Sequence, residues 1–159
     1  MISTDRLDLS PFTVATATAT VSGERGDLPW ADGFPREDDQ DAARMWVRAP
    51  HDVFGSWFIA ERVTGEIVGT IGFYGPPDAD GELMVGYGLV PQARGRGYAT
   101  EALRALVAHG LAQPGVTRIA ADPDLDNVAS HNVLHKAGFH PTHATETSQW
   151  YALNRVRAP

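Results

Sequence analysis

The chain contains no cysteine among its 159 residues, which excludes disulfides, thiolate metal sites and cysteine nucleophiles. It also has no apolar run long enough to span a bilayer. The first residues, from Met1 to Arg6, do not show the basic and then apolar pattern of a secretory signal. We therefore expect a cytoplasmic protein that has no membrane partner.

Acidic and basic side chains are unequal in number and in position. The formal net charge is −7, which argues against a nucleic-acid partner. Residues 1–91 contain 15 Asp and Glu against 6 Lys and Arg, whereas residues 92–159 contain 5 against 7. The C-terminal half is therefore the expected place for an anionic ligand and the acidic half for an amine, unless the asymmetry is only solvated surface.

The length fits one domain with a core that needs no disulfide, and we assign residues 1–159 to that domain. Apolar patterns predict helices at 37–48, 99–111 and 127–136. Residues 13–21 fit a strand by their alternation of threonine with alanine or valine, and a helix by the possible cap at Thr13. Strand patterns occur at 6–9, 54–60, 67–74, 83–89, 116–121, 139–143 and 148–154.

The stretch from Val85 to Ala102 combines a strand, a turn with two glycines and the start of a helix. Pro91 ends the strand because it cannot donate to a ladder. Gly95 and Gly97 allow backbone conformations closed to other residues and let a ligand approach the main chain. Free N–H groups at the helix start, the helix dipole and two nearby arginines then predict a phosphate or pyrophosphate site. A plain tight connection is the alternative at this point.

Two blocks of sequence resemble a known family. Gln92-Ala93-Arg94-Gly95-Arg96-Gly97 is similar to the Gln/Arg-x-x-Gly-x-Gly/Ala acetyl-CoA signature of the GNAT superfamily of N-acetyltransferases. Asn-Val-Ala-Ser at 127–130 and Val-Leu-His-Lys-Ala-Gly-Phe at 133–139 resemble the branch that acetylates ribosomal-protein N-termini. Gly-Tyr-Ala-Thr-Glu-Ala at 97–102 is also typical of that branch, and the element order resembles the GNAT fold over nearly the whole chain.

The resemblance implies an α/β (α+β) GNAT fold, with a mixed, mostly antiparallel sheet of about six to seven strands and helices on both faces. Its fourth and fifth strands, 83–89 and 116–121, are expected to be parallel and splayed, and 13–21 is expected to be helical. The resemblance implies an acyltransferase that moves the acetyl group of acetyl-CoA to a primary amine without a metal. The acceptor is a protein N-terminus or a small molecule, and the enzyme is a monomer or homodimer.

The same resemblance implies where the cosubstrate binds. The pyrophosphate of CoA is expected on main-chain N–H groups from 94–99, and the pantetheine on the exposed strand edge at 88–90. Asn127 and Ser130 are expected to contact the pantetheine or hold that region together, although Asn127 also fits a plain helix cap. The predicted acetyl-CoA residues are Gly88, Leu89, Val90, Arg94, Gly95, Arg96, Gly97, Tyr98, Ala99, Thr100, Asn127 and Ser130.

Catalysis in this family is direct attack of an unprotonated amine on the thioester, and this chain departs from the family pattern twice. Met84 stands where many relatives have a glutamate, and Leu134 stands where many superfamily members have a tyrosine. Glu82 lies two residues before Met84, hence on the same strand face, and is the predicted base. Asp122 is an alternative, although turn capping is the commoner role for such a residue, and a chain of water molecules is another. Ser130 is predicted to act on the thiolate, and His143 or Glu146 could also reach the cleft.

The predicted acceptor site is the loop at 27–35, which carries Trp30 and Phe34. Aromatic rings on an exposed loop can form the wall of a substrate site, although packing onto the core is their commoner arrangement.

A non-catalytic acyl-CoA-binding or regulatory module on the same fold is the alternative to an enzyme, because Met84 and Leu134 remove two familiar catalytic groups. A nucleotide-binding protein fits less well. The Gly-Lys-Ser/Thr ending of the P-loop is missing, and Thr100 stands where the dinucleotide fingerprint has its third glycine.

Overall fold

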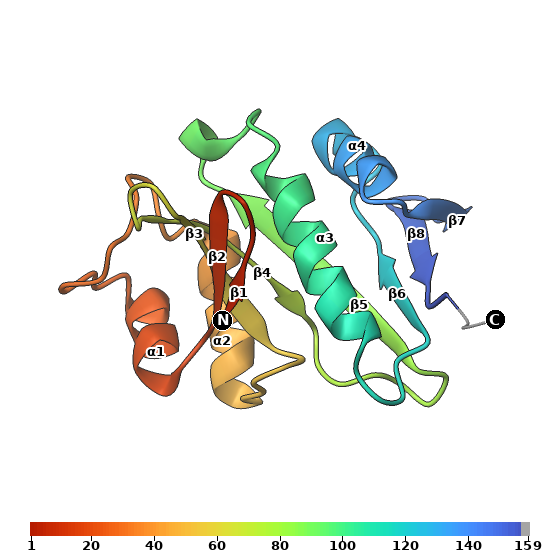
Figure 1. Cartoon of the computed structure of the whole chain (residues 1–159), viewed down its shortest axis with the longest axis horizontal. Helices are drawn as coiled ribbons and strands as arrows, with labels where there is room; N and C mark the ends of the chain where they lie inside the picture. Colours follow the sequence, from red (N-terminus) through yellow and green to blue (C-terminus); the bar gives the residue numbers. More distant parts are fainter. Residues whose placement is uncertain (157–159) are drawn as a thin grey trace.

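The computed structural model describes residues 1–156, which form an eight-stranded sheet with four α-helices and one 3₁₀ turn, η1 (Pro91–Ala93) (Figure 1). The sheet order is β1-β2-β3-β4-β5-β6-β8-β7. The strands are β1 (Ile2–Ser3), β2 (Leu7–Pro11), β3 (Ser56–Glu61), β4 (Ile67–Phe73), β5 (Glu82–Leu89), β6 (Arg118–Ala121), β7 (His140–Ala144) and β8 (Gln149–Asn154). The helices are α1 (Val14–Ser22), α2 (Glu37–Arg48), α3 (Tyr98–Leu111) and α4 (Val128–Lys136). None of these helices combines the length and apolarity needed to cross a bilayer.

The predicted fold class is confirmed, with one more strand than expected. Neighbouring strands are antiparallel except β5 and β6, which are parallel. The additional strand is β1, whose two residues pair with Leu9 and Asp8 of β2. A strand of two residues has no period to detect, so the sequence pattern did not predict it. The predicted single domain extends to residue 159, beyond the described residues.

The parallel strands β5 and β6 separate after three residue pairs. Glu82 lies opposite Arg118, Leu83 opposite Ile119 and Met84 opposite Ala120, and the pairing ends there. On its other side β5 stays paired with β4 up to Leu89. The expected splay is therefore confirmed, and within residues 1–156 no strand pairs with the β6-facing edge of β5 from Val85 onwards.

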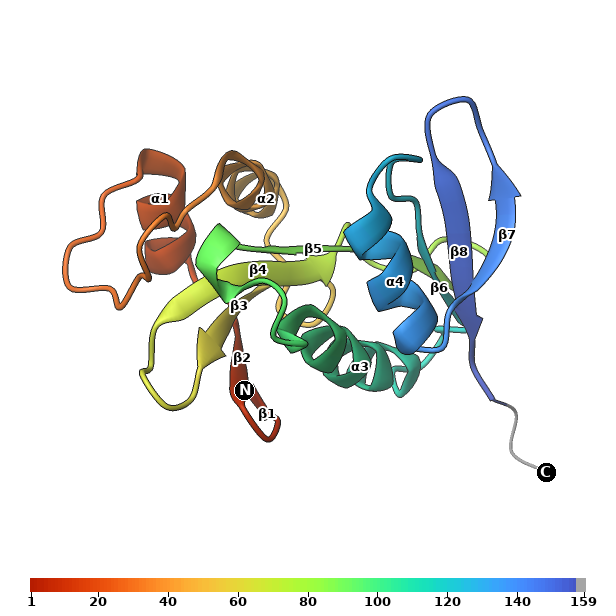
Figure 2. The same cartoon turned by 90° about the horizontal axis from the view of Figure 1, so that it is seen from above.

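Helices cover both faces of the sheet, as predicted (Figure 2). α1 and α2 lie on one side of β3, β4 and β5, and α3 lies on the other, with α4 beside it. The ambiguous segment at 13–21 is helical: the Thr13 hydroxyl accepts from the N–H of Thr16, and the Thr16 hydroxyl accepts from that of Thr13. This capping box outweighs the period-two pattern. The inner face of α3 buries Leu103, Leu106 and Val107, the predicted apolar stripe.

A buried carboxylate fixes α2 to the sheet. Asp39 is 0% exposed and forms an ion pair with Arg36 at 2.8 Å. Its two oxygens accept hydrogen bonds from the Arg36 main-chain N–H, from Nε and Nη2 of the same arginine, and from the Thr70 hydroxyl of β4 at 2.6 Å. Because every acceptor position has a donor, the carboxylate is tolerated in the core. The acidic first turn of α2 thus has a structural role that the helix dipole alone did not predict.

Replacing this carboxylate should destabilise the fold. Asp39→Asn removes the buried charge beside Arg36, so we expect the free energy of unfolding to fall by about 3 kcal/mol. The matched control is Asp41→Asn on the same helix, whose ion pair with Arg44 is exposed. That change should cost less than about 0.5 kcal/mol. Urea unfolding measures both, and equal losses would contradict a special role for Asp39.

Candidate functional site

The glycine turn presents a row of main-chain donors at the start of α3. Gly95 and Gly97 have φ of +75° and +80°, the left-handed region that favours glycine. Within residues 1–156, no hydrogen bond is donated by the main-chain N–H groups of residues 95–100. Donors without partners at a helix start, together with the positive end of the helix dipole, bind anions. The predicted anion site therefore has the required geometry.

Side chains distant in sequence hold this turn in place. Arg6 donates to the carbonyl of Arg96 at 2.7 Å, and the Tyr98 hydroxyl donates to Glu61 at 2.8 Å. The guanidinium groups of Arg6 and Arg96 lie 4.7 and 4.6 Å from the centre of the Tyr98 ring. Arg96 also pairs with Glu61, and Arg6 with Glu101. Because carboxylates partly neutralise both arginines, the attraction for an anion rests mainly on the N–H groups.

Three adjoining cavities surround β5. The turn cavity, of about 330 Å³, extends from the glycine turn along β5 to α4. The strand-gap cavity, of about 140 Å³, lies where β5 and β6 separate, and the α2 cavity, of about 400 Å³, lies between α2 and strands β4 and β5. Tyr87 lines all three, so they meet at one point of β5. The turn cavity is lined by Arg36, Asp38, Tyr87, Gly88, Leu89, Arg94, Ala99, Asn127, Ala129, Ser130 and Val133.

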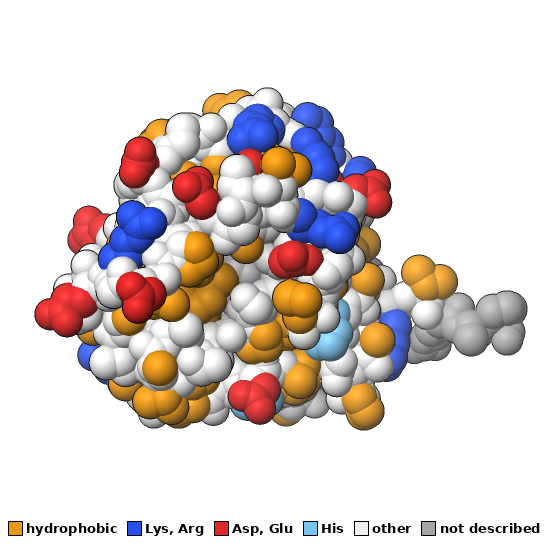
Figure 3. All heavy atoms as spheres, turned by 60° about the vertical axis from the view of Figure 1, so that its left-hand side comes forward, with side chains coloured by type: hydrophobic (Ala, Val, Ile, Leu, Met, Phe, Trp, Pro, Cys, Tyr) orange, Lys and Arg blue, Asp and Glu red, His pale blue; other side chains and the backbone are white. Residues whose placement is uncertain are grey.

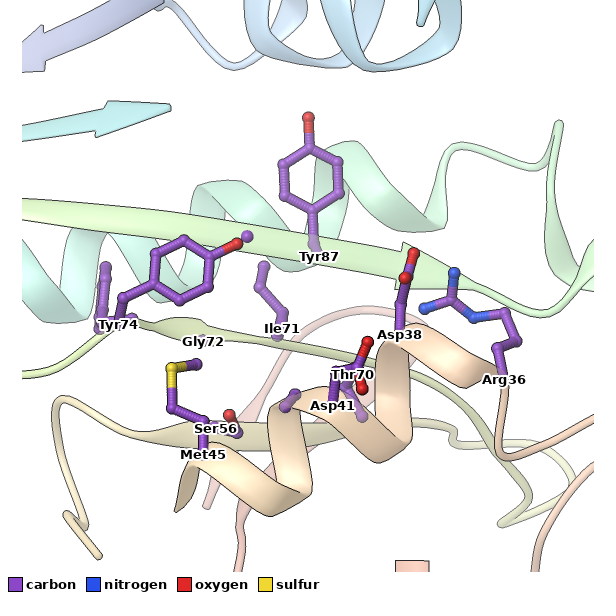
Figure 4. Close-up of a pocket in the computed structure, with 13 residues that line it drawn as sticks. Arg36, Asp38, Asp41, Met45, Ser56, Thr70, Ile71, Gly72, Tyr74 and Tyr87 are labelled. Carbon is purple, nitrogen blue, oxygen red and sulfur yellow. The ribbon is translucent and has the colours of Figure 1, made fainter. Parts of the chain in front are cut away.

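The α2 cavity is formed by the acidic N-terminal half of the chain (Figure 4). Asp38, Asp41 and Met45 line it from α2, while Tyr74 and Gly86 line it from the sheet. Figure 3 shows that acidic side chains on the α1 and α2 side are interspersed with basic and apolar ones. Basic groups gather toward the top of that view, the end at which Figure 1 places the glycine turn. The α2 cavity thus contains carboxylates, but the guanidinium of Arg36 lines it as well.

Tyr87 crosses from β5 towards α4. Its hydroxyl donates to the main-chain carbonyl of Ser130 at 3.4 Å, and burial raises the pKa of Tyr87 to about 12. Its side chain points away from Tyr74 and the residues of α2 (Figure 4).

Asn127 caps α4, because its side-chain oxygen accepts from the N–H of Ser130 at 3.2 Å. Leu134 is fully buried at the far wall of the strand-gap cavity.

Half of the twelve predicted acetyl-CoA residues line one cavity. Gly88, Leu89, Arg94, Ala99, Asn127 and Ser130 all line the turn cavity. Arg94 donates to the carbonyl of Leu89 at 3.0 Å, which ties the turn to the strand. Val90 and Thr100 are buried behind this surface. The residues that the sequence patterns missed, Arg6 and Glu61 among them, lie in other elements and have no local motif.

Glu82, the predicted base, lies at the beginning of β5, at the opposite end from Leu89. It forms a short ion pair with Arg118 and lines a separate pocket with Asp78 and Asp80. Asp122 instead follows β6 and lines the strand-gap cavity. Partial burial, assisted by the charge of Asp124, raises the pKa of Asp122. The structure therefore places Asp122, and not Glu82, beside Ser130.

Trp30 and Phe34 are part of the hydrophobic core. They are 4% and 7% exposed, and their rings pack edge to face at 5.5 Å. Phe34 also packs against Phe58 of β3 at 6.1 Å. The commoner arrangement of aromatic side chains thus applies to this loop, and the two rings do not form an exposed wall. The loop reaches the glycine turn by another contact, from the Gln92 amide to the carbonyl of Asp32.

Comparison with known proteins agrees with this geometry. The family described as acetyltransferase (GNAT) domain matches residues 6–140. A curated relative, the uncharacterized N-acetyltransferase YjdG of Bacillus subtilis (strain 168), is 37% identical over 103 residues. That match covers 64% of this chain and 61% of the relative, so less than two thirds of the relative's length is spanned.

Two solved structures have a similar fold. The GNAT-family acetyltransferase from Bacillus anthracis has a TM-score of 0.72 and 19% identity, and the match covers 97% of this chain and 98% of that one. RimL, a ribosomal L7/L12 alpha-N-protein acetyltransferase in complex with coenzyme A, has a TM-score of 0.69 and 18% identity, with 95% of each chain covered. On the evidence of the family match and of the fold, this chain belongs to the GNAT acetyltransferase domain family.

Proposed function

We propose that the protein transfers the acetyl group of acetyl-CoA to a primary amine by direct attack on the thioester. One observation carries this proposal: the main-chain N–H groups of 95–100 have no partner among the described residues, and a cavity lined by Arg94 and Ala99, on either side of this turn, extends to Gly88 and Leu89 of β5, beyond its pairing with β6. A pyrophosphate and a peptide-like arm are the two parts of CoA that such surfaces bind. Family membership supports the same conclusion.

Acetyl-CoA is proposed to bind with its pyrophosphate on the main chain of 95–99 and its pantetheine along Gly88 and Leu89, whereas Val90, which the sequence also suggested, is fully buried. Asn127 and Ser130 would contact the pantetheine from α4, the opposite wall of the turn cavity. Glycine at position 88 leaves room for the Arg36 guanidinium, with which a side chain there would collide. This arrangement directs the thioester towards Gly86 and Tyr87, where the three cavities meet.

The acceptor amine is proposed to enter through the α2 cavity. Its carboxylates, Asp38 and Asp41, attract an ammonium group, and Met45 supplies an apolar wall. The cavity reaches Gly86 from the side of the sheet opposite α3, so acceptor and cosubstrate approach β5 from different faces. Both a protein N-terminus and a small-molecule amine carry the group that this site selects.

The chemistry requires an unprotonated amine and a polarised thioester carbonyl. Main-chain N–H groups on the free edge of β5 are suited to the second task. Asp122 is better placed than Glu82 to deprotonate the amine, because Asp122 lines the strand-gap cavity. Its raised pKa also makes it a stronger base. The assignments of Glu82 as base and of Ser130 to the thiolate stay predictions.

Turnover with a panel of amines tests the proposal. We expect CoA release from acetyl-CoA that depends on the amine, together with an acetylated product detected by mass spectrometry. Tight binding of acetyl-CoA without any product would instead support a non-catalytic acyl-CoA-binding module. Stronger thermal stabilisation by ATP or NAD than by CoA would support a nucleotide-binding protein.

Gly97→Val should weaken CoA binding at least roughly tenfold, because it distorts the turn that aligns the donors. The matched control is Gly65→Val, since Gly65 has a φ of +76° in the hairpin between β3 and β4. Both variants carry similar backbone strain, but only the first alters the anion site. Calorimetric titration with CoA measures the difference, and unchanged affinity in Gly97→Val would contradict the pyrophosphate assignment.

The raised pKa of Asp122 predicts a pH-dependent stability. The folded chain binds this proton more tightly than the unfolded chain, so stability falls as pH rises between the unfolded and the folded pKa of the group. Asp122→Asn removes the destabilisation that comes from ionising this carboxyl in the folded chain. The Tm of the variant should therefore exceed that of the wild type at about pH 7. The gain should shrink as the pH falls below the unfolded pKa. Thermal unfolding across this range measures it, and a gain independent of pH would contradict the prediction.

A further inference from the structure

Tyr74 places a phenol beside Gly86, where the α2 cavity and the strand-gap cavity adjoin. It follows β4 directly, and its N–H donates to the carbonyl of Met84 at 3.0 Å. Its ring reaches from β4 to β5, so that a side chain at Gly86 would collide with its hydroxyl (Figure 4). Tyr74 lines both the α2 cavity and the strand-gap cavity. Its hydroxyl therefore faces the passage through which an acyl group would reach the acceptor.

The Tyr74 hydroxyl is available to a ligand. Although Tyr74 is 56% exposed, partial desolvation of its hydroxyl, followed by the charges of Asp122 and Asp38, raises its pKa, and no side-chain hydrogen bond to a described residue contributes. The phenol is therefore protonated at neutral pH and has a proton to donate. Both carboxylates that act on it line the same cavities, Asp122 on the strand-gap side and Asp38 on the α2 side.

The other side chains around this point are less suited to donate a proton to sulfur. Tyr87 already donates to the carbonyl of Ser130, and its ring lies on the opposite face of β5. Leu134 is apolar and fully buried. Ser130 also lines the strand-gap cavity, but an aliphatic hydroxyl is a much weaker acid than a phenol.

We propose that Tyr74 is the catalytic residue that protonates the departing thiolate of CoA. This inference rests on the proposed function. The amine nitrogen forms a bond to the acetyl carbon, the carbon–sulfur bond breaks, and its electron pair goes to sulfur. The phenol proton moves to that sulfur and leaves a tyrosinate. The tyrosinate then recovers the proton that the amine nitrogen loses, through Asp122 or water, and the products are the amide and the CoA thiol.

Tyr74→Phe removes the proton and keeps the ring. We expect kcat to fall roughly 100-fold, while the KM values for acetyl-CoA and the acceptor and the Tm stay close to those of the wild type. The control is Tyr151→Phe, because this tyrosine of β8 lines none of the three cavities and its hydroxyl pairs with His131 of α4. Its kcat should stay within about twofold of the wild type. A kcat for Tyr74→Phe that matches the control, or a loss confined to acceptor KM, would overturn the proposal.

A second measurement needs no acceptor. If the phenol donates to sulfur, it stabilises the thiolate of bound CoA, so the pKa of that thiol should be lower in the wild type than in Tyr74→Phe. Ultraviolet absorbance of the thiolate during a pH titration of the CoA complex measures it. Equal thiol pKa values, or a rise in Ser130→Ala and none in Tyr74→Phe, would overturn the proposal. A protein that binds CoA without turnover would refute the proposed function, while this titration would still test Tyr74.

Discussion

The loss of pairing between β5 and β6 after Met84 is the constraint on which the site depends. A strand in the middle of a sheet normally satisfies the N–H and C=O groups on both of its edges. Here β4 satisfies one edge of β5 as far as Leu89, while the other edge has no strand partner from Val85. Beyond β5, the main-chain N–H groups of residues 95–100 in the glycine turn also have no hydrogen-bond partner among the described residues. The proposed cosubstrate site is thus formed mainly by main-chain groups, and side chains hold these groups in position.

The buried carboxylate of Asp39 sets the opposite wall. It fixes the Arg36 guanidinium and connects the first turn of α2 to Thr70 of β4. Arg36 in turn covers Gly88 and lines both the turn cavity and the α2 cavity. Because Asp39 has no exposed surface, this wall does not move independently of the core. One ion pair therefore positions the α2 cavity, the proposed acceptor site, relative to the turn cavity.

The sequence predicted the parts of the site that are local. The glycine turn, the Asn127 cap and the α3 stripe each depend on residues within one or two helical turns, and all three are found in the structure. Arg6, Glu61 and Asp39 were missed because their partners come from distant elements or are revealed only by burial. Trp30 and Phe34 show a different limit of sequence-based prediction. The sequence places two large rings on a loop, but only the packing of the folded chain decides whether they face the core or the solvent.

The sequence Gly86-Tyr87-Gly88 connects these observations. Successive side chains of a strand point to opposite faces, so the two glycines share one face and Tyr87 occupies the other. On the glycine face, the space that two side chains would fill is taken by the Tyr74 hydroxyl at Gly86 and by the Arg36 guanidinium at Gly88. On the other face, Tyr87 spans the gap to α4 and reaches the carbonyl of Ser130. Two glycines normally weaken the interior of a strand. In Gly86-Tyr87-Gly88 they instead leave room on one face of β5 for a phenol and a guanidinium. Neither group is visible in the motif itself, since both come from other elements.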